Sequence, residues 1–262
     1  MKLLAYLVAL AGVLLSLCAS STAQTNDARE VLDLNTLQDR GGKHSYYIFI
    51  PEHDLHVKPV PLIVILHGAG GNGIGQIQAW LPVARRNHVI LLAPNIENSP
   101  AAWDQLYDHP EWIHSAIDDI GKTHAIDTHR VYLWGYSAGG MFTFYFAFLE
   151  SRFFAAAGVY GAVIENSKYQ MADFATRKIP ISYYIGTRDQ WWTTRQTRAS
   201  RDALLSRGFQ VHYAELKGAD HNFYAHSSEV TTDAWDFFRQ HALTDEPHFD
   251  AIDLPRIKAA LK

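Results

Sequence analysis

The chain lacks long hydrophobic runs except near its N-terminus, where a run extends from Leu3 to Leu17. This run is shorter than the roughly 20 residues needed to span a membrane, which disfavours a transmembrane anchor. Lys2 precedes the run, and the small residues Ser21 and Ala23 follow it at the −3 and −1 positions of a cleavage site. These are the three parts of a secretory signal peptide. We therefore expect residues 1–23 to be removed and the protein to be secreted or periplasmic, with no membrane attachment after cleavage.

Cysteine is almost absent, since Cys18 is the only one in 262 residues. Cleavage after Ala23 would leave a mature chain without any, which excludes disulfides, thiolate metal sites and a cysteine nucleophile. A lipid-anchored alternative through Cys18 is disfavoured, because Leu17 stands where such sites usually carry a small residue. The mature chain must then be stabilised by core packing, which its length allows.

The sequence also lacks a basic run of the kind that binds nucleic acid or an anionic membrane surface. Its net charge is −4, with both signs mixed along the chain. We therefore expect a small-molecule or oligomeric substrate as partner. The 14 histidines are scattered without metal-binding spacing, so we expect neither a metal nor a cofactor. With 48% hydrophobic residues and no repeats, residues 24–262 are predicted to form a single domain.

Short apolar segments alternate with segments of helical periodicity. The predicted strands are apolar on both faces, which is typical of a sheet covered on both sides; they are 45–51, 61–68, 88–94, 130–135, 154–161, 179–186 and 211–216. The predicted helices are 74–87, 110–124, 141–150, 193–208 and 227–241. Pro82 is expected to shorten or kink the first of them. The alternation predicts the α/β class with a mostly parallel sheet.

One serine lies where a predicted strand passes directly into a predicted helix. Gly135 and Gly139 flank Ser137 in a Gly-x-Ser-x-Gly motif, for which about 0.1 chance matches are expected in a chain of this length. A tight strand–turn–helix needs small neighbours, and it lifts the hydroxyl out of the sheet. The same turn directs the backbone N–H of Ala138 and the helix dipole toward developing negative charge. Ser137 is therefore a candidate nucleophile.

A serine nucleophile needs a base and an acid that orients the base. In this architecture both follow the serine in the chain, in the order serine, acid, histidine. Asp189 follows the strand at 179–186 and His221 follows the strand at 211–216, so these two are the candidates. His226 is a rival base and Asp202 a weaker rival acid.

The glycine-rich segment 67–73, HGAGGNG, follows the strand at 61–68. Such a loop approaches a ligand closely and can supply a second N–H for an oxyanion hole, for which Ala69 is the first choice and Gly70 the second. A phosphate-binding role is disfavoured because neither nucleotide motif is present. His67 is expected to orient the loop.

Taken together, these segments resemble the alpha/beta-hydrolase superfamily. The blocks that carry the likeness are YYIFIPE, PLIVILHGAGG, AIDTHRVYLWGYSAGG, FFAAAGVYGA, PISYYIGTRDQWW and LKGADHNF. They are most similar to exported esterases such as feruloyl esterases and polyhydroxybutyrate-depolymerase-like enzymes. The resemblance implies an alpha/beta-hydrolase fold with Ser137 as nucleophile, Asp189 as acid and His221 as base. The chain departs from many such proteins in its lack of cysteines and of a large lid, since only residues 162–178 offer a modest excursion.

The expected activity is hydrolysis of carboxylic esters through an acyl-enzyme. Trp103, Trp191 and Trp192 are predicted to stack on a phenolic acyl group or a sugar, although packing in the core is an equally good interpretation. Polyester-type compounds are a second candidate class of substrate. Two alternatives also stand: a serine peptidase of the prolyl-oligopeptidase type, and a non-catalytic hydrolase-like binding protein.

Overall fold

The computed structural model describes residues 30–39, 42–52, 58–96, 103 and 108–251. The expected signal peptide and Cys18 lie outside these residues. Among the described residues, no helix has the length and apolar character to cross a membrane.

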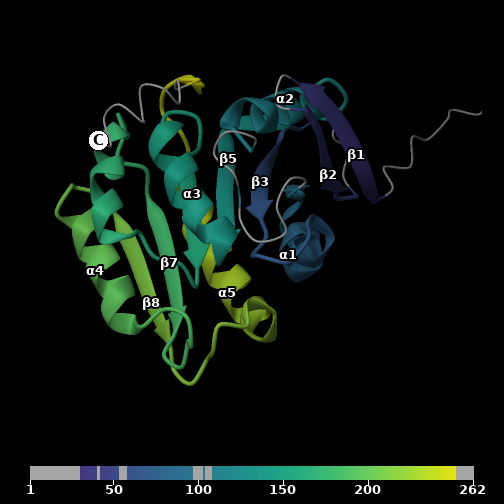
Figure 1. Ribbon diagram of the computed structural model, residues 1–262. Coiled ribbons are helices and arrows are strands. Elements are labelled where there is room, and N and C mark those ends of the chain that lie inside the picture. The colour runs from purple at the N-terminus through teal and green to yellow at the C-terminus, as the bar shows by residue number, and fades with distance from the viewer. Residues whose placement is uncertain (1–29, 40–41, 53–57, 97–102, 104–107, 252–262) are drawn as a thin grey trace, which may run out of the picture.

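Eight strands form one sheet in the order β1-β2-β4-β3-β5-β6-β7-β8 (Figure 1). β1 and β2 pair antiparallel, as do β2 and β4, and the remaining neighbours are parallel. The strands are β1 (Val31–Asp39), β2 (Gly42–Ile50), β3 (Val60–Leu66), β4 (Ile90–Pro94), β5 (Ile126–Tyr136), β6 (Ala156–Tyr160), β7 (Ile181–Gly186) and β8 (Val211–Leu216). The mostly parallel α/β arrangement predicted from the sequence is confirmed.

Helices cover both faces of the sheet. They are α1 (Gly73–Asn87), α2 (Pro110–Gly121), α3 (Ala138–Leu149), α4 (Thr194–Leu205) and α5 (Phe223–Phe238), with a 3₁₀ helix η1 (Asn166–Phe174). Their starts follow local chemistry, because the Asn72 side chain accepts from the Gly75 amide and Thr193 forms a capping box with Gln196. Of the two effects expected of Pro82, shortening of the helix was wrong, since α1 continues through it to Asn87, and a kink stays a prediction.

Two apolar cores lie on opposite faces of the sheet. One packs α2, α3, α4 and η1 against it, and the other packs α1 and α5. β3 shows why both form: all seven of its residues are buried, and successive side chains point into alternate cores. The aromatic-rich α3 is buried along almost its whole length. The sheet is therefore fixed from both sides, which holds the loops at its strand ends in place.

Residues 162–178, the expected excursion, contain η1. The edge strand β1 was not expected, because its sequence VLDLNTLQD contains no continuous apolar run. Most of its side chains are at least partly exposed, with Leu32 and Leu34 among the exposed large apolar residues.

Candidate active site

Ser137 occupies the sharp turn between β5 and α3. Its backbone lies at φ 54° and ψ −117°, a conformation that a residue with a side chain rarely adopts. The turn is held by the Ser137 amide, which donates to the Tyr160 carbonyl of β6 at 2.9 Å. A methyl group at Gly139 would lie 2.3 Å from the Leu66 carbonyl oxygen, and one at Gly135 would lie 2.3 Å from the Gly139 carbonyl oxygen. Both glycines are therefore required by close backbone contacts.

His221 lies in the loop between β8 and α5, with its imidazole between the other two predicted residues. Its Nε2 is 2.9 Å from Ser137 Oγ, and its Nδ1 is 2.7 Å from Asp189 Oδ2. A carboxylate only accepts hydrogen bonds, so Nδ1–H donates to Asp189, and Nε2 is left to accept from the serine hydroxyl. The rivals lie elsewhere: His226 is within α5, and Asp202 is within α4, where it accepts from Arg201.

Asp189 follows β7, and its side chain is fully buried. The carboxylate oxygen that does not face His221 accepts from the Trp191 amide at 2.8 Å and the Trp192 amide at 2.9 Å. Burial raises the pKa of Asp189, but the hydrogen bonds from His221 and the two amides outweigh it and leave the pKa below its usual value. Asp189 is therefore an ionised group held in one orientation.

Two residues at the end of β6, Tyr160 and Gly161, support the histidine loop and were not singled out from the sequence. The Tyr160 hydroxyl donates to the Asp220 carbonyl at 2.7 Å. Gly161, at φ 62°, lies so close to the His221 ring that a methyl group there would be 3.1 Å from Nδ1. The only sequence signal was the glycine directly after a strand, which fits many positive-φ turns.

His67 anchors the glycine-rich loop beside Ser137. Its Nδ1–H donates to the Gly68 carbonyl at 2.8 Å, and its Nε2 accepts from the Ile96 amide at 3.2 Å. Burial lowers the pKa of His67, an effect only partly offset by the hydrogen bond to Gly68, so the ring is neutral near pH 7. The Trp103 indole N–H also donates to the His67 carbonyl at 2.9 Å.

The two predicted oxyanion-hole residues belong to two segments that meet at Ser137. Ala138 follows it as the first residue of α3. Ala69 is exposed and adjoins Gly68, where a methyl group would lie 3.2 Å from Ser137 Cβ. Gly70, the second choice, has φ 68°. The glycine-rich loop and the start of α3 therefore meet beside the serine hydroxyl.

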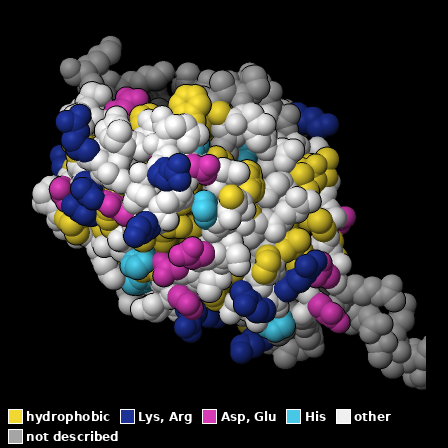
Figure 2. Space-filling model, turned by 90° about the horizontal axis from the view of Figure 1, so that it is seen from below, with side chains coloured by type: hydrophobic (Ala, Val, Ile, Leu, Met, Phe, Trp, Pro, Cys, Tyr) yellow, Lys and Arg dark blue, Asp and Glu magenta, His cyan; other side chains and the backbone are white. Residues whose placement is uncertain are grey.

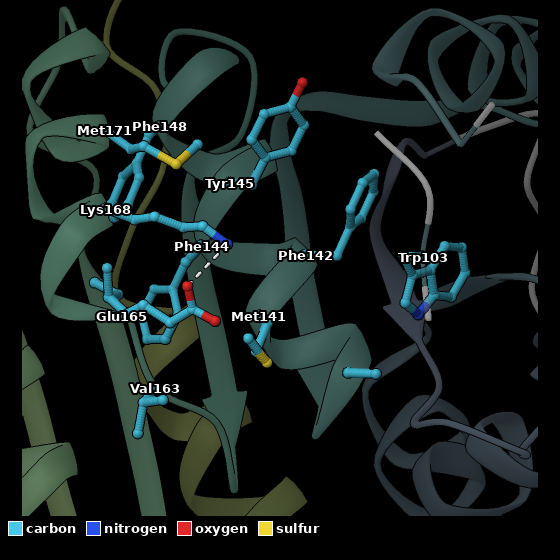
Figure 3. Close-up of a pocket in the computed structure, with 12 residues that line it drawn as sticks. Trp103, Met141, Phe142, Phe144, Tyr145, Phe148, Val163, Glu165, Lys168 and Met171 are labelled. Atoms are coloured by element: carbon cyan, nitrogen blue, oxygen red, sulfur yellow. Dashed lines mark ion pairs between the residues drawn. The ribbon is translucent and has the colours of Figure 1, made fainter. Parts of the chain in front are cut away.

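An apolar pocket of about 250 Å³ begins at Ala138 and extends over α3 (Figure 3). Trp103 forms one side, and Val163 and η1 form the other, so the excursion at 162–178 supplies a wall. Glu165 and Lys168 form an ion pair there at 3.0 Å. The lining residues are Trp103, Ala138, Met141, Phe142, Phe144, Tyr145, Phe148, Val163, Ile164, Glu165, Lys168 and Met171.

A second, more polar pocket of about 410 Å³ adjoins His221. It is lined by Gly68, Ala69, Gly70, Gly71, Tyr136, Gln190, Trp191, His221, Asn222 and Tyr224. Trp191 is 68% exposed, and its ring centroid is 6.2 Å from that of His221. Of the three predicted aromatic residues, Trp103 and Trp191 thus line different pockets, whereas Trp192 lines neither of these two.

Charged side chains of both signs are interspersed on the face seen from below in Figure 2. Histidines and small apolar groups lie between them, and no large patch of one sign appears on that face. This face is consistent with the mixed charge pattern of the sequence.

The sequence was compared with protein families and with characterised proteins. Residues 46–246 match the dienelactone hydrolase family. A bifunctional acetylxylan esterase/xylanase of Neocallimastix patriciarum is 26% identical over 239 residues, covering 78% of this chain and 34% of that protein. Feruloyl esterase B of Thermothelomyces thermophilus is 30% identical over 156 residues, covering 54% of this chain and 52% of that protein. The chain thus spans about a third and about half of the lengths of these relatives.

Among solved structures, a ferulic acid esterase from Anaeromyces mucronatus in complex with ferulic acid has a TM-score of 0.65. The two are 16% identical, and the match covers 88% of this chain and 95% of that one. At this identity the likeness shows the fold alone, and it confirms the expected alpha/beta-hydrolase fold. The resemblance to polyhydroxybutyrate depolymerases stays a prediction.

Proposed function

The chain belongs to the dienelactone hydrolase family, and on that basis we propose that it is a secreted carboxylic ester hydrolase that works through an acyl-enzyme on Ser137. The observation that carries the proposal is the continuous hydrogen-bonded line from Ser137 through His221 to Asp189. A serine hydroxyl becomes a useful nucleophile when a positioned base takes its proton, and this line provides both the base and the group that orients it.

The reaction proceeds in two similar halves. His221 Nε2 takes the hydroxyl proton as Ser137 Oγ attacks the ester carbonyl carbon. The tetrahedral intermediate collapses when the charged imidazole returns that proton to the leaving alkoxide, which departs as the alcohol. Water then enters, gives a proton to His221 and attacks the acyl-enzyme, and Ser137 leaves as the regenerated hydroxyl. Asp189 stays ionised and stabilises the imidazolium in both halves.

The negative oxygen of each intermediate is stabilised by the backbone N–H groups of Ala138 and Ala69. Ala138 is in the first turn of α3, where amides lack partners within the helix and the helix dipole is positive. Ala69 belongs to the loop that packs beside Ser137. Removing one such donor from an oxyanion hole typically costs about 10²–10³ in kcat.

The two pockets divide the substrate between them. His221 protonates the leaving alcohol and lines the polar pocket, so the alcohol part occupies that side. Ala138 and Met141 line the apolar pocket, which receives the acyl part. This acyl group is apolar and aromatic, flanked by Trp103 and Phe142. A sugar or similar polar alcohol fits the polar pocket, with Trp191 at its rim. The similarity to a feruloyl esterase supports the aromatic acyl group, and the similarity to an acetylxylan esterase supports only the sugar-like alcohol.

The decisive test of the mechanism is Ser137→Ala. We expect the variant to fold normally and to lose about 10⁶ in kcat, as triads of this type do. A fluorophosphonate probe should label the original protein and leave the variant unlabelled. Failure of the original protein to react with the probe favours the non-catalytic binding protein, and faster hydrolysis of a peptide amide than of an ester favours the peptidase.

The acyl preference is tested with methyl ferulate, a short aliphatic ester and a hydroxyalkanoate oligomer. We expect the highest kcat/KM for methyl ferulate. Equal values for the aromatic and short aliphatic esters contradict the aromatic acyl assignment, and a preference for the oligomer favours a polyester substrate.

Export rests on the pattern at residues 1–23 and is tested separately. Expression in a bacterial host should release a chain that begins at Gln24, measured by intact mass of the periplasmic fraction. Retention of the full-length chain in the cytoplasm contradicts the proposal.

A further inference from the structure

We propose that Asp39, His44 and His109 form a binding site for a divalent transition-metal ion, with Zn²⁺ as the expected occupant. None of the three belongs to the hydrogen-bonded line of Ser137, His221 and Asp189, and none lines either of the two pockets described above. Each offers one ligand atom, and these atoms all lie within 4.8 Å of one another.

The Asp39 carboxylate stands between the two imidazoles. Its Oδ1 is 2.9 Å from His44 Nε2, and its Oδ2 is 3.1 Å from His109 Nε2. Zinc binds nitrogen and oxygen ligands at about 2.0–2.2 Å, so ligand atoms around one ion are separated by roughly 3–4 Å. The two aspartate–histidine distances are close to this range, and all three ligand atoms lie within 4.8 Å of one another.

Three separate elements bring these ligands together. Asp39 is the last residue of β1 and pairs with Gly42, while His44 is two residues farther along β2 and so points to the same face of the hairpin. His109 comes from the other side, as the N-cap residue of α2. A metal ion here would join the β1–β2 hairpin to the start of α2.

The surroundings of the cluster restrict the motion of its ligands. His44 is fully buried, and its ring stacks on Trp112 with centroids 4.4 Å apart and planes at 7°. His109 is 3% exposed, and its Nδ1 lies 3.7 Å from the Glu111 carboxylate. Metal-bound histidines commonly donate a hydrogen bond from the other ring nitrogen to a carboxylate, and Glu111 lies on that side of His109.

The donor set selects the class of metal. Two imidazoles with one carboxylate suit divalent transition metals such as Zn²⁺, Fe²⁺, Cu²⁺ and Ni²⁺, whereas Ca²⁺ and Mg²⁺ prefer oxygen ligands throughout. Three protein ligands leave a fourth position for water. The sequence did not indicate the site, because His109 is far from the hairpin in the chain and no spacing motif links the three residues.

His212 provides a matched control. Its Nε2 is 2.7 Å from Asp233 Oδ2, so it forms an equally close histidine–aspartate pair. Both side chains are more than two-fifths exposed, and the pair does not belong to a cluster of three possible ligands among the described residues. Losing His212 should therefore leave metal affinity unchanged.

The experiment is calorimetric titration of the chelator-treated full chain with ZnCl₂, and then with CaCl₂. We expect one Zn²⁺ per chain, a zinc-dependent rise in Tm, and no binding of Ca²⁺. Loss of a metal's outer partner commonly costs about 10–100-fold in affinity, so His44→Gln and His109→Gln should each cost at least that. His212→Gln should bind Zn²⁺ as the original protein does.

Absence of Zn²⁺ binding by the original chain overturns the proposal, as does undiminished affinity in well-folded His44→Gln and His109→Gln variants. Where a variant fails to fold, X-ray absorption of the zinc-loaded original chain decides. Two imidazole ligands completed by oxygen support the site, and any other ligand set overturns it. Zinc binding by Ser137→Ala is also measured. This variant should lose ester hydrolysis and still bind Zn²⁺, so the metal site and the proposed esterase function are tested separately.

Discussion

Replacing Asp189 with asparagine tests whether one carboxylate sets the protonation of the catalytic histidine. The side chains differ little in size, so the fold should be retained. The asparagine oxygen should remain on the Trp191 and Trp192 amides, which now meet one carboxylate oxygen at 2.8 and 2.9 Å. The opposite orientation would turn an NH₂ group toward these two donors, and leaving the partly buried Trp192 amide unsatisfied alone costs about 1–3 kcal/mol.

With its oxygen held there, the asparagine presents its NH₂ group to His221 Nδ1. Nδ1 must then accept a hydrogen bond, which places the ring proton on Nε2, facing Ser137 Oγ. A protonated Nε2 cannot take the serine proton. An inverted tautomer of this kind lowers kcat by about 10⁴, which corresponds to about 5.4 kcal/mol in the activation free energy.

The assay is kcat for a soluble aryl ester, with far-UV circular dichroism and Tm to establish folding. Asp220→Asn is the matched control, because Asp220 adjoins His221 and its carboxylate accepts from the Asn222 amide instead of the imidazole. We expect Asp220→Asn to retain kcat within about tenfold, since it leaves the hydrogen bond to Nδ1 intact. A folded Asp189→Asn variant with kcat near that of the original protein refutes the reasoning.

Three further substitutions test the turn, the loop and the pocket. Gly139→Ala sets a methyl group 2.3 Å from the Leu66 carbonyl oxygen and should lower the unfolding free energy by about 3 kcal/mol. In the control Gly121→Ala, the nearest atom to the new methyl group is 3.9 Å away, so the unfolding free energy should rise by about 0.4–1 kcal/mol. Urea denaturation measures both changes. Burial lowers the pKa of His67 below 6.5, so as pH falls below 6.5 the unfolded chain takes up a proton that the folded chain resists, and stability falls until pH passes the folded-state pKa. His67→Gln should therefore make Tm less dependent on pH in that window, and an unchanged slope contradicts a buried neutral ring. Val163→Phe fills part of the apolar pocket and should lower kcat/KM for methyl ferulate at least tenfold, because a steric mismatch costs roughly 1–3 kcal/mol. The kcat/KM for an acetyl ester should be unchanged. Equal losses for both esters place the acyl group elsewhere.

The sheet was predictable wherever strands are buried on both faces, because a short unbroken apolar run such as that of β3 is typical of a strand in the middle of a covered sheet. β1 was missed for the opposite reason, since an exposed edge strand carries polar residues and is specified mainly by its pairing with β2. Helix limits differed by a few residues, as at α5, which begins at Phe223 and not at residue 227.

The positions of Ser137, Asp189 and His221 could be predicted because each follows a strand, and the carboxyl ends of parallel strands lie at one edge of the sheet. The support from Tyr160 depends on contacts between loops, which sequence spacing does not reveal. The tryptophans show the same limit. The sequence left open whether they line the site or pack in the core, and only packing decides that Trp103 lines a pocket wall and Trp191 a rim.

The positive φ of Ser137 makes the proposed active site sensitive to local opening of the sheet. A residue in such a conformation stores on the order of 1–3 kcal/mol of strain and keeps it only while its surroundings enforce it. Here the enforcement comes from the Tyr160 carbonyl and from the close approach of Gly139 to β3. Slight fraying at the ends of these strands would let the serine relax and turn its hydroxyl away from the imidazole. On gradual warming, turnover should therefore disappear at a lower temperature than the bulk of the helical signal.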